Sequence, residues 1–92
     1  MGRLQYRRSM VTMQEVTRRD HRSADATWFG STIRRLREER GLTQAQLAEA
    51  ADLSSTYLGI IERGENVPTL TVILQIAAGL DLHPIDLFRD YR

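Results

Sequence analysis

Two short helical patterns lie close together in residues 43–63, TQAQLAEAADLSSTYLGIIER, and they limit what the chain can fold into. The sequence predicts helices over residues 44–51 and 55–63. Thr43 and Ser54 precede them, and such side chains accept hydrogen bonds from the free N–H groups of a first helical turn. Because only a short break separates the two helices, the pattern predicts a helix-turn-helix corner.

The apolar residues of the two helices indicate which faces meet. Ala48 and Ala51 are small, so the helices can cross closely at these positions. Leu58 and Ile61 are three residues apart and therefore share the inward face of the second helix. The outward face consists of Ser55, Thr56, Gly59 and Ile60. A helix that protrudes in this way fits the major groove of B-DNA, which is about 12 Å wide.

This stretch resembles the helix-turn-helix of the lambda-repressor-like (Cro-like, XRE-type) regulators of bacteria and phages. The resemblance covers about residues 29–88. The matching positions are TQAQLA at 43–48, Leu58, Ile61, the run Glu62-Arg63-Gly64, and Pro68-Thr69-Leu70. It implies an all-α, five-helix lambda-repressor-like DNA-binding domain over residues 29–92. A basic N-terminal extension, residues 1–28, precedes this domain, and we expect it to be flexible.

The remaining helices are expected over about residues 27–40, 70–80 and 84–89. The second of these is apolar around most of its girth, which predicts that it is the central helix of the core. At two turns the resembled family prefers glycine, and this chain has Asp52 and Asp81 there. Aspartate tolerates a positive φ better than most residues, so we expect the fold to be kept.

The resemblance implies sequence-specific DNA binding with the helix over residues 55–63 in the major groove. The candidate DNA-contacting residues are Gln44, Ser54, Ser55, Thr56, Tyr57, Gly59, Ile60, Arg63 and Asn66. Gln44 is implied to contact a phosphate, at a helix end that favours anions. The predicted outward face offers no Arg, Gln or Asn for a bidentate base contact, so Ser55 and Thr56 are the residues left to form hydrogen bonds to the bases. Tyr57 either donates to a phosphate or packs on the preceding helix.

Two sets of structural contacts are also implied by the resemblance. Arg37 and Glu62 are expected to form an ion pair that ties the first predicted helix to the end of the recognition helix. Breaking such a pair costs a few kcal/mol when it is buried. The surface around the last two helices is expected to form a homodimer, with Ile85, Phe88 and Tyr91 as candidate interface residues.

Charge is unevenly distributed along the chain. All thirteen basic residues are arginine, and residues 1–28 carry a net charge of +3 whereas residues 29–92 carry −2. DNA-binding domains are usually basic as a whole, so this balance favours a second hypothesis, a protein-interaction module or antitoxin-type partner with the same fold. The extension has two open roles beside that of a flexible tail. It is either a basic arm that reaches DNA through Arg18, Arg19 and Arg22, or a segment that binds a protein partner.

Other function classes find little support. The chain has no cysteine and two histidines, so we expect no metal site and no cofactor. It has no apolar run near the ~20 residues of a membrane span and no signal-peptide pattern, so we expect a cytoplasmic protein. No catalytic constellation is evident, so we expect no enzyme. The leading hypothesis is a homodimeric transcription regulator of double-stranded DNA: a phage-type repressor, a restriction-modification controller or an antitoxin that represses its own operon.

Overall fold

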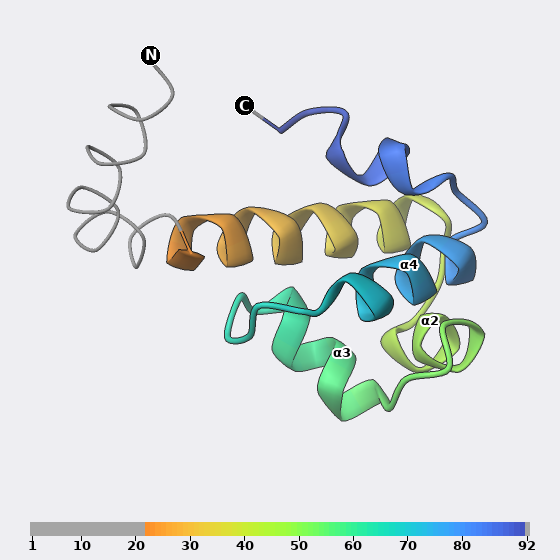
Figure 1. Cartoon of the computed structure of the whole chain (residues 1–92). Helices are drawn as coiled ribbons and strands as arrows, with labels where there is room; N and C mark the ends of the chain where they lie inside the picture. The colour runs from red at the N-terminus through yellow and green to blue at the C-terminus, as the bar shows by residue number, and fades with distance from the viewer. Residues whose placement is uncertain (1–21, 92) are drawn as a thin grey trace, which may run out of the picture.

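The computed structural model describes residues 22–91, and all regular structure in this part is helical. The first helix covers residues 22–39. It is followed by α2 (Gln44–Ala50), α3 (Ser55–Glu62), α4 (Leu70–Gly79) and the 3₁₀ helix η1 (Pro84–Phe88). Figure 1 shows the first helix running across the molecule, with α2, α3 and α4 on one side and the C-terminal segment on the other. The predicted all-α fold is confirmed.

The first helix begins earlier than predicted. Residues 22–26, which precede the predicted start of this helix, are also helical. The reason is that Ala26 is buried and that the loop at Gly64 packs closely on this part of the helix, since a Cβ added to Gly64 would lie 2.9 Å from the Cα atom of Thr27. A single small apolar residue gives only a weak helical pattern. The expected flexible tail lies, for residues 1–21, outside the described part of the chain.

Local hydrogen bonds fix the starts of α2 and α3. The Thr43 hydroxyl accepts from the Gln46 backbone N–H at 3.0 Å, and the Gln46 side chain accepts from the Thr43 N–H at 2.8 Å. These reciprocal bonds form a capping box. The Ser54 hydroxyl accepts from the Tyr57 N–H at 3.0 Å. Both predicted caps are therefore confirmed.

The turn between α2 and α3 depends on tertiary contacts as well as on its own sequence. Asp52 has a φ of 60° and Asp81 a φ of 59°, as expected where they replace glycine. The Gln75 side chain donates to the backbone carbonyl oxygens of Ala51, at 3.0 Å, and Asp52, at 3.3 Å. A Cβ at Gly79 would meet Ala51 at 3.0 Å, so α4 crosses the turn at close range.

The core lies between the first helix and the other helices. Its fully buried large side chains are Ile33, Leu47, Leu58, Ile61, Ile76, Leu80 and Leu87. The prediction that α4 is the central core helix is wrong, because Leu70 is 70% exposed and Leu74 is 44% exposed. Only one side of α4 faces the core, and its outer side leaves leucines in solvent. Within residues 22–91, no helix has the length and apolar character needed to cross a membrane.

Candidate nucleic-acid interface

A buried ion pair sets the position of α3. The Arg37 Nε atom lies 2.7 Å from the Glu62 Oε2 atom, and the Arg37 Nη2 atom lies 3.2 Å from the Glu62 Oε1 atom. A third N–H of Arg37 donates to the Leu42 carbonyl oxygen at 2.8 Å. The hydrogen bond to Glu62 raises the pKa of Arg37 above its ordinary value. The expected pair is present, and it joins the first helix to the end of α3.

Gln44 extends this ion pair to α2. Its side-chain Nε2 atom donates to the Glu62 Oε1 atom at 2.9 Å. A primary amide has two N–H donors, so one of them is still available for a group outside the protein. The side chain that the resemblance assigns to a phosphate is therefore held in place by the buried carboxylate.

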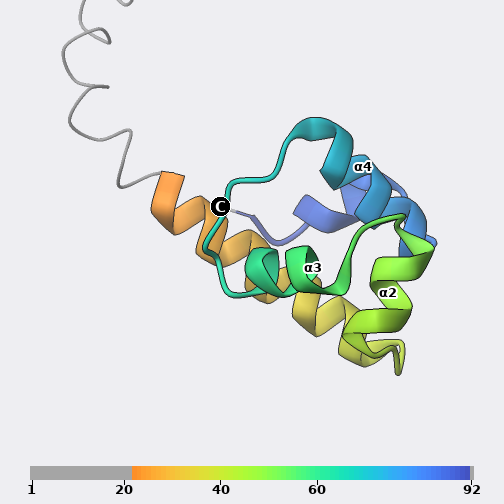
Figure 2. The same cartoon turned by 90° about the horizontal axis from the view of Figure 1, so that it is seen from below.

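A polar hollow on the α2–α3 face brings together five of the predicted DNA-contacting residues. They are Gln44, Ser55, Thr56, Gly59 and Arg63. In the view of Figure 2, α2 and α3 lie at the front of the molecule. Gly59 is buried, and a Cβ there would lie 3.3 Å from the Arg63 Nη1 atom and 3.6 Å from the Gln44 Oε1 atom. Gly59 thus forms the floor of the hollow and not the exposed contact that we expected. Ile60 is half-buried at the side of α3.

Tyr57 links α3 to the loop that follows it. Its hydroxyl donates to the Asn66 Oδ1 atom at 3.1 Å, and its ring packs partly against the core. Neither of the two roles left open for Tyr57, a phosphate contact or packing on α2, is tested by these contacts. Asn66 keeps its amide N–H groups for other partners, since its oxygen is the atom that Tyr57 uses.

Arg63 lies at the edge of the hollow and has an acidic neighbour. Its guanidinium binds the Glu65 carboxylate through two contacts, of 3.1 Å and 3.3 Å. Both side chains are more than half exposed. The hydrogen bond to Glu65 raises the pKa of Arg63 above its ordinary value. This pair, which no sequence pattern predicted, offsets the one positive charge at the hollow.

Comparison with known proteins assigns the family. Residues 28–89 match the helix-turn-helix domain family. The chain belongs to this family. The matched segment contains α2, α3, α4 and η1 in full and most of the first helix. This confirms the resemblance to XRE-type regulators that the sequence indicated.

Three relatives show how far the similarity extends. The HTH-type transcriptional regulator PrpR of Mycobacterium tuberculosis is 43% identical over 61 residues, which are 66% of this chain but 13% of PrpR. The control protein C.MunI of a Mycoplasma species is 36% identical over 63 residues, 67% of this chain and 85% of C.MunI. The crystal structure of the restriction-modification controller protein C.AhdI from Aeromonas hydrophila has 42% identity and a TM-score of 0.69, over 71% of this chain and 98% of that one. The helix-turn-helix domain therefore spans only a small part of PrpR.

Gly30 is a structural residue of this helix-turn-helix domain that sequence analysis missed. A Cβ added to Gly30 would lie 2.2 Å from the Ile61 carbonyl oxygen and 2.7 Å from the Glu62 carbonyl oxygen. The first helix therefore lies directly against the end of α3. A glycine inside a helix costs about 1 kcal/mol of stability relative to alanine. The presence of glycine at such a costly position was the only sign in the sequence that another segment packs closely there.

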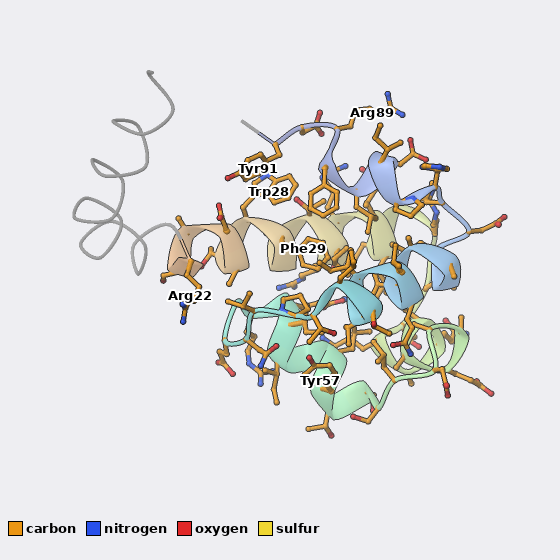
Figure 3. All side chains as sticks on the ribbon, viewed as in Figure 1. Arg22, Trp28, Phe29, Tyr57, Arg89 and Tyr91 are labelled. Carbon is orange, nitrogen blue, oxygen red and sulfur yellow. The ribbon has the colours of Figure 1, made fainter. Side chains whose placement is uncertain are left out.

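The candidate dimer residues lie on the opposite side of the first helix from α3, and two of them have partners within the chain. Phe88 stacks on Trp28 and Phe29, with ring centroids 6.0 Å and 5.9 Å apart. Tyr91 meets the edge of Trp28 at 5.0 Å, and its hydroxyl donates to the Asp25 carboxylate at 2.8 Å. Figure 3 shows Tyr91 beside Trp28. Ile85, at 64% exposed, is the most exposed of the three candidates.

Proposed function

We propose that this helix-turn-helix domain is a sequence-specific DNA-binding transcription regulator that acts in the cytoplasm as a homodimer. The observation that carries the proposal is the polar hollow, where Gln44 on α2 is held beside the exposed Ser55 and Thr56 of α3. The names of several relatives, which describe transcription regulators and control proteins, support it. Binding at an operator would act by blocking or aligning the polymerase.

The recognition step follows from the chemistry of the hollow. With α3 in the major groove, the hydroxyl groups of Ser55 and Thr56 would bond to base edges, and the half-buried Ile60 would contact a thymine methyl group. Gln44 would donate its remaining N–H to a phosphate, and Asn66 would do the same from the loop after α3. Phosphate contacts fix the register of the protein on the duplex, while base contacts carry the sequence preference.

A second copy of the chain would cover the exposed apolar residues of α4 and η1. Leu70, Leu74 and Ile85 are 70%, 44% and 64% exposed, respectively. Two copies related by a two-fold axis would read half-sites about 34 Å apart, one turn of the double helix. Because one α3 helix offers few base contacts, the second copy would raise both affinity and specificity.

Selection from random-sequence DNA followed by sequencing tests this function. We expect a two-fold symmetric motif for the wild-type chain. Thr56→Ala should relax the preference at one base of each half-site, because only a base contact is removed. Gln44→Ala should weaken binding to all sequences alike, as a lost phosphate contact does. Recovery of no motif even at low salt would contradict the proposal and favour the protein-interaction module.

A further inference from the structure

The positive charges of the domain are almost all engaged by acidic groups or carbonyl oxygens. Within residues 22–91, six arginines have such partners. They are Arg34, Arg35, Arg37, Arg40, Arg63 and Arg89. Arg22 is the exception, since no described carboxylate forms an ion pair with it. It is also exposed to solvent. Within the part of the chain that the structure describes, its charge is therefore not neutralised by an acidic group.

The nearest acidic residue on the same helix faces elsewhere. The Asp25 carboxylate accepts the hydroxyl of Tyr91, on the side of the first helix that carries the C-terminal segment. Figure 3 shows the Arg22 side chain on the other side of this helix, the side that α3 occupies. Arg22 thus shares a side of the molecule with the recognition helix.

Arg22 lines a hollow where the start of the first helix meets the loop after α3. The other lining residues are Ser23, Ala26, Gly64, Glu65, Asn66 and Val67. This loop carries Asn66, whose amide N–H groups are not used by Tyr57. A guanidinium, a serine hydroxyl and amide N–H groups are all donors, which suits an anion with several oxygens. Glu65 is the one acidic group at this hollow, and Arg63 binds it.

DNA binding requires cations close to the phosphates, and the recognition helix provides none. The sequence of α3, STYLGIIE, contains no basic residue. Arg63, just after α3, shares its charge with Glu65. Electrostatic attraction to phosphates normally supplies most of the non-specific affinity of a DNA-binding protein. Among the described residues, a cation near α3 that has no acidic partner would therefore supply this attraction.

We propose that Arg22, together with Ser23 and Asn66, forms a second phosphate-binding site that holds the DNA backbone beside the bases read by α3. This proposal rests on the proposed DNA-binding function. It assigns the first turn of the first helix to the DNA interface. It also makes Glu65 an acidic neighbour that weakens phosphate binding by holding Arg63.

The test is the salt dependence of DNA affinity, measured for the full-length chain on the selected motif. Arg22→Gln should lower the affinity and reduce the slope of log K against log[salt] by about 0.9, the value for one phosphate contact. The preferred sequence should stay the same. Arg35→Gln is the matched control, because this exposed arginine lies on the same helix and pairs with Asp90 of the C-terminal segment. It should leave the slope unchanged.

Glu65→Gln tests the second part of the proposal, that Glu65 weakens phosphate binding by holding Arg63. It should raise the affinity and steepen the slope, since Arg63 is released for a phosphate. Arg22→Gln with a wild-type slope would overturn the proposal, provided that the wild-type chain selects a motif. A wild-type chain without any motif would instead refute the DNA-binding function itself. Arg22→Gln and Glu65→Gln both alter exposed side chains, and thermal unfolding would verify that each variant is folded.

Discussion

At the residue scale, Glu62 connects the stability of the fold with the proposed DNA interface. Its side chain is 2% exposed and accepts three hydrogen bonds, two from Arg37 and one from Gln44. Removing one member of a buried ion pair costs about 3–5 kcal/mol, because the other charge is left without a partner. The same carboxylate holds the side chain that we propose to meet a phosphate. Loss of Glu62 would therefore damage the fold and the DNA interface together.

Gly30 provides a sharper test of the contact between the first helix and α3. Gly30→Ala should lower the free energy of unfolding by about 1–3 kcal/mol, because its new methyl group would overlap the Ile61 and Glu62 carbonyl oxygens. Urea denaturation measures this change. Gly59→Ala is the control, since a Cβ there meets only flexible side-chain ends. It should cost nothing or stabilise by up to about 1 kcal/mol. Equal stability of the two variants would contradict the close packing.

Residue-scale prediction from sequence depended on whether the signal was local. The ion pair of Arg37 and Glu62 was implied by the resemblance and is present. Gly30 and Gln75 were missed because their roles depend on which segments meet in space: one faces the end of α3, and the other binds carbonyl oxygens of the α2–α3 turn. The proposed DNA contacts of the hollow stay predictions, which the selection experiment tests.

At the element scale, the C-terminal segment is attached to the first helix by aromatic contacts. Phe88 and Tyr91 both pack on Trp28, and the Tyr91 hydroxyl donates to Asp25. This hydrogen bond, together with the negative charge of Asp25, raises the pKa of Tyr91 above its ordinary value of 10.0. The neutral phenol is thus favoured in the folded chain. Its contribution to stability is complete below pH 10 and is lost as the pH rises through the raised pKa.

Fluorescence of Trp28, the chain's single tryptophan, should report this change. We expect an alkaline transition above about pH 10 in the wild-type chain, as the Tyr91 phenolate is repelled by Asp25 and leaves the tryptophan. Tyr91→Phe keeps the ring but removes the ionising group, so this transition should be absent. Identical titrations of the two proteins would show that Tyr91 does not control docking of the C-terminal segment.

Element boundaries were predicted well where caps define them and poorly where packing does. Thr43 and Ser54 act through hydrogen bonds to their own helices, so α2 and α3 begin where the sequence indicated. The first helix begins before its predicted start because Ala26 is buried and the loop at Gly64 packs on this part of the helix. No local sequence pattern reveals this packing. The prediction that α4 is the central core helix was also wrong, because hydrophobicity alone does not distinguish a face in the core from an apolar face in solvent.

At the scale of the whole molecule, α4 and η1 expose several large apolar side chains. Leu70, Leu74 and Ile85 are exposed there, with Phe88 close by and 41% exposed. Apolar patches of this kind mark interaction sites. None of these four residues lines the polar hollow, so the proposed dimer contact and the proposed DNA contact use different side chains.

Introducing negative charge into this apolar patch tests the homodimer. Leu74→Glu combined with Ile85→Glu should convert the protein to a monomer in sedimentation experiments, because two buried carboxylates would face the partner copy. Affinity for a two-fold symmetric site should fall at least tenfold, while thermal unfolding of the monomer should still be cooperative. Ala50→Glu adds a negative charge at the exposed end of α2, and the sedimentation mass of this variant should remain that of the dimer. A wild-type chain that is monomeric at high concentration would refute this arrangement.

Ser55 and Thr56 form no side-chain hydrogen bond with any described residue, whereas their neighbours Gln44 and Glu62 are bonded to each other. The scaffold and the proposed reading positions are thus separate. Substitutions at these two positions would alter the operator without a cost in folding, so related chains can diverge in target while keeping one architecture. The same separation makes this small domain a starting point for designing regulators with chosen DNA targets.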